Sequence, residues 1–142
     1  KFCIGGAEVP TEGKPDPEKI LKKIEMGVDF FQTQFVFDEI ILEEYMKVLE
    51  DSGILERTFF IIGLGPFASA KSAKWMNKNL FGVDVPEKII NRLEQAQDAK
   101  KESKNICKEL INKFKEIKGV KGIHLMGHNK EEAIAEIIQE SR

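Results

Sequence analysis

Short apolar segments alternate with amphipathic segments along the whole chain. Residues 2–6, 58–64 and 123–126 are runs of aliphatic and aromatic residues, and a fourth strand-like run covers 27–38. Each run is followed by a stretch in which apolar residues recur at helical spacing. Strands that are joined through helices pair in parallel through right-handed crossovers. The order of segments therefore predicts an α/β fold with four parallel strands alternating with helices.

Two architectures fit this order. One is a small doubly wound sheet, and the other is half of a (β/α)8 TIM barrel, whose full length is about 250 residues. The chain starts at Lys1 rather than Met and carries polar residues inside its strands. Barrel strands send alternate side chains into a lumen, so we expect the half-barrel, a single domain over 1–142 within a longer polypeptide. In both architectures ligands bind at the carboxyl ends of the strands.

Local signals mark the expected helices. Residues that can cap a helix start precede three of the amphipathic stretches: Asp16, Asp38 and Ser69. Asn129, with Glu132 three residues later, fits a capping box for the last helix. Residues 86–117 are helical in pattern, and the polar stretch 95–105 within them fits a helix break or an exposed middle.

Composition excludes several classes of function. With 22 basic and 24 acidic residues the net charge is −2, which gives no electrostatic case for binding nucleic acid or an anionic membrane. The longest charge-free run, 58–70, is shorter than the about 20 apolar residues that span a bilayer. Cys3 and Cys107 form no metal-binding spacing, which favours two free thiols in a reducing cytoplasm.

The segment 27–38, GVDFFQTQFVFD, places polar residues in the middle of a strand. Strand alternation predicts two faces, one with Phe31, Thr33, Phe35 and Phe37 and the other with Phe30, Gln32, Gln34 and Val36. The two amides on one face need partners, because an unpaired buried amide costs about 1–3 kcal/mol. Gln34, near the carboxyl end, is therefore a candidate to bind a flat heterocycle such as a pterin or flavin. The alternative is that neighbouring side chains or water satisfy both amides.

Two further groups of residues are weaker candidates. His124, Met126 and His128 share one face of the last strand, but no acidic or cysteine ligand lies nearby in sequence. One core histidine and one loop histidine is the favoured interpretation. Asp16 and Lys23 are about two helical turns apart and lie on one side of the first helix. Spacing alone indicates a helix cap and a solvated lysine.

Together these segments resemble the methylenetetrahydrofolate reductase family. Asp16, Lys23 and the run TQFVFD at 33–38 are similar to an acidic residue, a lysine and a strand end of that family. The run GVKGIHLMGHN at 119–129 is similar to the family's closing strand. The resemblance covers nearly the whole chain but only the carboxyl-terminal half of the family's barrel. It implies flavin-dependent reduction of methylenetetrahydrofolate, or a related methylene-pterin, to the methyl form.

The resemblance also implies roles for single residues. Gln34 matches a glutamine that contacts the folate. Asp16 and Lys23 match residues that contact the ribityl and phosphate parts of the flavin, which is FAD, with FMN as the alternative. A stacking aromatic residue of the family corresponds to Met76, and the closing-strand tyrosine corresponds to Met126. Gln32 receives no role.

The resemblance leaves the catalytic residues of this chain unknown. The family's catalytic acid and its flavin-tuning acidic residue lie in the first half of the barrel. We therefore expect a folate-type substrate, and as protein partner either a second copy, giving a homo-oligomer, or the missing half of the barrel. The alternative is a non-catalytic module for binding or interaction, a flavodoxin-like sheet or a half-barrel with protected edges.

Overall fold

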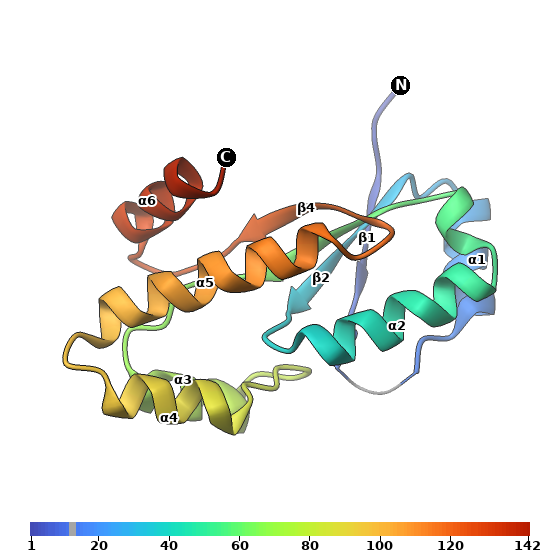
Figure 1. The fold of residues 1–142 in the computed structure, drawn as a ribbon. Helices are drawn as coiled ribbons and strands as arrows, with labels where there is room; N and C mark the ends of the chain where they lie inside the picture. The colour runs from blue at the N-terminus through green and yellow to red at the C-terminus, as the bar shows by residue number, and fades with distance from the viewer. Residues whose placement is uncertain (12–13) are drawn as a thin grey trace.

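One parallel sheet organises the computed structural model, which describes residues 1–11 and 14–142. Its strands pair in chain order and are β1 (Gly5–Glu8), β2 (Phe30–Phe35), β3 (Phe60–Leu64) and β4 (Val120–Leu125). Right-handed crossovers between strands in this order place the connecting helices on one face. A doubly wound sheet would need the strand order to reverse. The expected half of a (β/α)8 barrel is therefore confirmed (Figure 1).

Helices fill the connections between the strands. In the described residues they are α1 (Pro17–Glu25), α2 (Glu39–Asp51), the 3-10 helix η1 (Ile54–Glu56), α3 (Ala70–Asn79), α4 (Glu87–Gln95), α5 (Ala99–Lys115) and α6 (Glu131–Ser141). The caps Asp16, Asp38 and Ser69 are confirmed, because each side chain accepts a bond from a first-turn N–H. The predicted helix break lies at 96–98, between α4 and α5.

The expected start of the last helix is wrong. Asn129 has a φ of 54°, in the left-handed region, and the N-cap residue is Lys130, which makes no side-chain capping bond. Asparagine tolerates this conformation better than most residues do. Asn129 therefore turns the chain after β4 instead of capping α6, and Glu132 has no capping-box partner.

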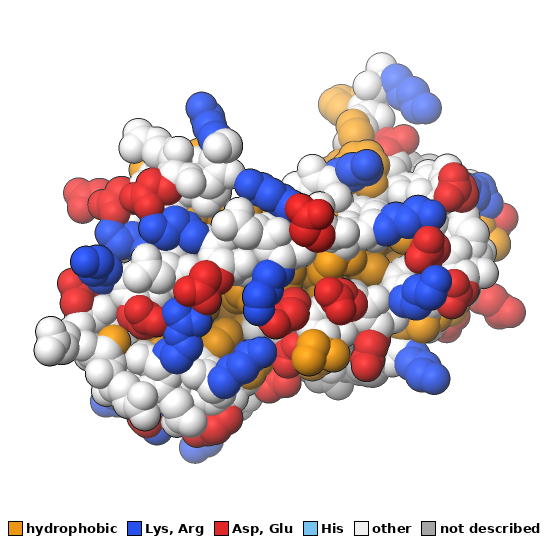
Figure 2. Space-filling view, in the orientation of Figure 1, with side chains coloured by type: hydrophobic (Ala, Val, Ile, Leu, Met, Phe, Trp, Pro, Cys, Tyr) orange, Lys and Arg blue, Asp and Glu red, His pale blue; other side chains and the backbone are white. Residues whose placement is uncertain are grey.

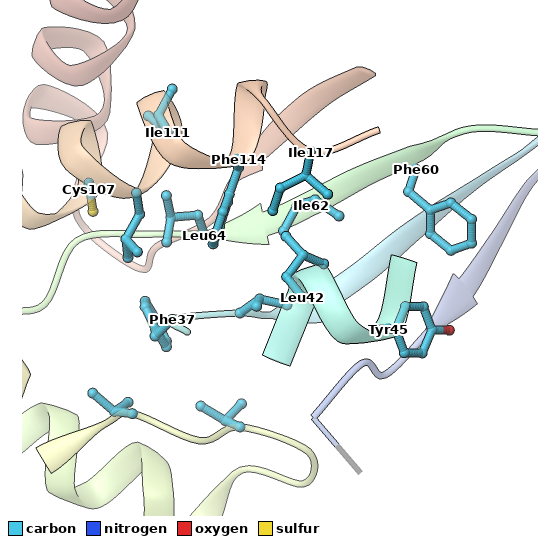
Figure 3. Close-up of a cluster of buried hydrophobic side chains, with 14 of the residues drawn as sticks. Phe37, Leu42, Tyr45, Phe60, Ile62, Leu64, Cys107, Ile111, Phe114 and Ile117 are labelled. Atoms are coloured by element: carbon cyan, nitrogen blue, oxygen red, sulfur yellow. The ribbon is translucent and has the colours of Figure 1, made fainter. Parts of the chain in front are cut away.

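The core lies between the sheet and its helices. Phe60, Ile62 and Leu64 of β3 are fully buried and point into this layer. Figure 3 shows them with side chains of α2 and α5, among them Leu42, Tyr45, Ile111 and Phe114. The rings of Phe31 and Phe60 stack with their centroids 5.2 Å apart across neighbouring strands. One face of the sheet is thus apolar and sealed.

The opposite face of the sheet is open. Gln32 and His124 are exposed there, and the rings of Phe30 and Phe59 stack with their centroids 5.7 Å apart. In a closed barrel this face lines the lumen. Gln32 and His124, two polar residues within the strands, therefore lie on the face that a closed barrel turns to its lumen.

The distribution of surface charge and the state of the two cysteines agree with what the composition predicted. Figure 2, seen from the side of α2 and α5, shows basic and acidic side chains interleaved rather than gathered by sign. Every helix in the described residues is too short or too polar to cross a membrane. Both cysteines are free thiols, Cys3 exposed and Cys107 buried, and burial raises the pKa of the Cys107 thiol to about 12.

Candidate functional site

The carboxyl end of β2 contains one extra residue. Gln32 pairs with Ile61 and Phe35 pairs with Gly63, so three steps along β2 match two steps along β3. This mismatch is a β-bulge, a feature that commonly re-aims side chains beside functional sites.

The bulge corrects the expected alternation of the strand. Phe31 and Thr33 are buried toward the helices, as predicted. Phe37 is buried as well, as predicted, but the assignment of Val36 is wrong, because Val36 was placed on the face of the glutamines and is fully buried. The extra residue shifts the side-chain period, so that Val36 turns into the core.

Two side chains replace the hydrogen bonds that the bulge removes from the sheet. The Thr33 hydroxyl accepts from the Gly63 N–H at 2.9 Å and donates to the Gln34 carbonyl at 2.8 Å. The Gln34 Oε1 accepts from the Phe35 N–H at 2.9 Å, and its Nε2 donates to the Phe81 carbonyl at 3.1 Å. A primary amide has two donor protons and two acceptor lone pairs. Gln34 therefore keeps one donor and one acceptor for a ligand.

Gly63 allows close packing beside Gln34. A Cβ at Gly63 would lie 2.5 Å from the Thr33 carbonyl oxygen, 2.7 Å from the Met126 methyl and 2.8 Å from the Gln34 carbonyl oxygen. Met126 therefore folds over Gly63 next to Gln34, and its soft thioether can cover a ring. Met76, which corresponds to the family's stacking aromatic residue, instead packs against the core.

The histidines of the last strand are both exposed. His124 pairs in register with Gly63 and lies on the open face, so the expectation of a core histidine is wrong. His128 is exposed in the loop after β4. Among the described residues, no three His, Cys, Asp or Glu side chains are grouped so that they could hold a metal ion.

Asp16 and Lys23 both have partners within the chain. The Asp16 carboxylate accepts from a first-turn N–H of α1 at 3.1 Å. The Lys23 ammonium contacts Glu8 Oε1 at 2.6 Å and the backbone carbonyl before Glu8 at 3.0 Å. Tyr45 donates to the other Glu8 oxygen at 3.2 Å, and burial, followed by the Glu8 charge, raises the pKa of Tyr45. Lys23 thus lies at the carboxyl end of β1 with one N–H left.

Sequence reasoning missed Glu8 and Phe81. The first strand was expected at 2–6, whereas β1 is Gly5–Glu8, so Glu8 lay outside the expected strand. Phe81 carries no local signal, because it meets Gln34 across 47 residues of chain.

The comparisons with known proteins agree with this geometry. A family model described as methylenetetrahydrofolate reductase matches residues 1–142. The chain belongs to the methylenetetrahydrofolate reductase family. The resemblance seen in the sequence is thereby confirmed. No curated protein matches the chain.

The fold is shared with solved structures. An uncharacterized protein from Clostridium thermocellum, which binds two copies of 5-methyl-5,6,7,8-tetrahydrofolic acid, is 23% identical with a TM-score of 0.64. The match covers 96% of this chain and 51% of that protein, so the chain spans about half of its length. This likeness agrees with a half-barrel.

Replacement of Gly63 tests the close packing at the bulge. We expect Gly63→Ala to destabilise the protein by about 1–3 kcal/mol, because the added methyl group meets backbone atoms that cannot move aside. Gly122→Ala is the matched control, since its nearest neighbour would be Ile61 at 3.9 Å. Urea unfolding measures both, and equal midpoints for the two variants would contradict this account of the bulge.

A double-mutant cycle tests the Lys23–Glu8 pair. Their side chains are only 33% and 17% exposed, so we expect a coupling energy of about 1 kcal/mol from Lys23→Met, Glu8→Gln and the double variant. The more exposed pair Lys74–Glu94, at 55% and 45%, is the control and should couple by about 0.5 kcal/mol or less. Denaturant unfolding gives both energies. If the coupling energy of Lys74–Glu94 equals that of Lys23–Glu8, partial burial does not strengthen the ion pair.

Proposed function

We propose that this chain forms part of the ligand site of a flavin-dependent reductase that converts methylenetetrahydrofolate, or a related methylene-pterin, to the methyl form. The observation that carries the proposal is the Gln34 amide, fixed at the carboxyl end of β2 with one donor and one acceptor to spare. Barrel enzymes bind their substrates at this end of the strands. Membership of the family supports the proposal, as does the folate bound by the structural neighbour.

The chemistry of the amide suits a pterin. The edge of a pterin ring offers neighbouring donors and acceptors in one plane, and a primary amide can bind such a pair. The bonds to Phe35 and Phe81 leave Gln34 a single arrangement of donor and acceptor. The Met126 methyl lies over Gly63, near the backbone carbonyl of Gln34, and offers an apolar surface to a flat ring. In this proposal Gln34 orients the substrate, and Met126 excludes water from one side of it.

Asp16 and Lys23 fit a flavin only in part. Lys23 would donate its remaining N–H to a phosphate, and the second oxygen of Asp16 would accept from ribityl hydroxyls. Glu8 neutralises the ammonium at 2.6 Å, so Lys23 acts as a hydrogen-bond donor more than as a free charge. FAD is the proposed cofactor, FMN is the alternative, and when bound in reduced form it is the source of hydride.

A second candidate function is ligand binding without catalysis. The open face of the four strands carries Gly5, Ala7, Phe30, Gln32, Ile61, Gly122 and His124. None of these residues has a carboxylate side chain. A proton donor of the carboxylic acid type would have to come from outside this face. In the reductase proposal, the other half of the barrel supplies it.

Replacement of Gln34 tests the proposed substrate site. In the protein as its gene encodes it, we expect Gln34→Ala to weaken binding of 5-methyltetrahydrofolate about fivefold to a hundredfold, because two hydrogen bonds to the ligand are lost. Affinity for FAD should change less than twofold. Gln34→Glu keeps the acceptor for the Phe35 N–H, so it separates loss of the amide donor from disturbance of the bulge.

The control for this experiment is Gln32→Ala, an exposed open-face amide without an assigned role. Isothermal titration calorimetry measures each affinity, and visible absorbance reports bound flavin. Equal affinities of the Gln34 and Gln32 variants for the folate would reject the proposed site. Folate binding by a protein that takes up no flavin would favour the second candidate function.

A further inference from the structure

The loop between α3 and α4 is fastened over the ends of β1 and β2. The carbonyl of Phe81 accepts from Gln34, and the next carbonyl, of Gly82, accepts from the Thr11 hydroxyl. Gly82 has a φ of 70°, and a Cβ there would lie 2.2 Å from a methyl group of Val9. Figure 1 shows this loop reaching from the α3–α4 pair toward the strand ends. The loop is therefore part of the site wall rather than a distant connection.

Phe81 presents its ring to solvent from this fastened loop. The side chain is 77% exposed and does not belong to the buried core. Its backbone oxygen is 3.1 Å from the Gln34 amide nitrogen, so the residue that carries the ring is bonded directly to the amide. Ligand sites combine apolar and aromatic walls with a few convergent polar groups. An exposed ring, carried by the residue whose backbone binds a half-satisfied amide, fits this pattern.

We propose that Phe81 is a ligand-binding residue, whose ring stacks on an aromatic ring of the folate-type ligand held by Gln34. The inference rests on the proposed function, because it requires such a ligand at Gln34. Offset stacking of two rings gives a favourable contact beyond the area that they bury. The chain then offers the ligand two apolar side chains near Gln34: Phe81, whose carbonyl accepts from the amide, and Met126, whose methyl lies over Gly63 near the Gln34 backbone carbonyl.

Phe81 also positions the amide through its backbone. Because the Phe81 carbonyl accepts from Gln34 Nε2, and Oε1 accepts from the Phe35 N–H, the amide cannot rotate without losing both bonds. A side-chain substitution at Phe81 leaves the carbonyl in place. Such a substitution therefore removes the ring while it keeps Gln34 oriented.

The test compares Phe81→Ala, Phe81→Tyr and Phe2→Ala in the protein as its gene encodes it. Phe2 is 91% exposed near the chain start and is the control for loss of an exposed ring. We expect Phe81→Ala to weaken 5-methyltetrahydrofolate binding about tenfold, and Phe81→Tyr and Phe2→Ala to stay within about twofold of the unsubstituted protein. The thermal midpoint of Phe81→Ala should stay unchanged, because so little of the ring is buried. Calorimetry and thermal unfolding give the two readouts.

Two ligand fragments identify the ring that Phe81 covers. Loss of affinity for p-aminobenzoylglutamate in Phe81→Ala assigns the ring to the benzoyl part, and loss for 6-methyltetrahydropterin assigns it to the pterin. If Phe81→Ala binds 5-methyltetrahydrofolate normally while Gln34→Ala does not, the inference fails and the proposed function stands. A changed solution mass with unchanged affinity also overturns the inference and makes Phe81 a contact between protein chains. No folate binding by the unsubstituted protein overturns both.

Discussion

The hydrogen bond from the Gly63 N–H to the Thr33 hydroxyl holds the candidate site together. An extra residue in a central parallel strand leaves backbone groups without partners, and each unpaired buried group costs about 1–3 kcal/mol. Thr33 satisfies the group on β3, and Gln34 satisfies the freed N–H of Phe35. The polar side chains of Thr33 and Gln34 therefore offset the cost of the bulge, because they bond the backbone groups that it leaves unpaired. The same bulge brings the Gln34 amide to the strand end.

The bulge also couples three neighbouring strands. It brings the carbonyl of Gln34 so close to β3 that only glycine fits at position 63, and Met126 from the end of β4 packs into the same space. Changes in the shape of one strand end would therefore move the others. Gly63 has little freedom to vary for this reason, although its backbone conformation is an ordinary extended one.

Local patterns were sufficient to predict four parallel strands alternating with helices, although they fitted both a doubly wound sheet and a half-barrel. The alternation of apolar and amphipathic segments, the caps at Asp38 and Ser69, and the break before α5 all depend on neighbours in sequence. The bulge could not be predicted, because alternation assumes a constant register between strands. Phe81 could not be predicted either, since only the folded chain brings it to Gln34. Gln34 itself was found because its polarity conflicts with a buried strand.

The open face and the strand ends of this half-barrel differ in how far the chain itself completes them. The open face, with stacked Phe30 and Phe59 rings, still requires a covering surface. The strand ends do not, because Gln34 and Lys23 are each held by bonds within the chain. A binding group that is already oriented loses less conformational freedom when a ligand arrives. This chain can therefore hold its share of a ligand site in shape, and the proposed reduction would take its proton donor from outside the four strands of this sheet.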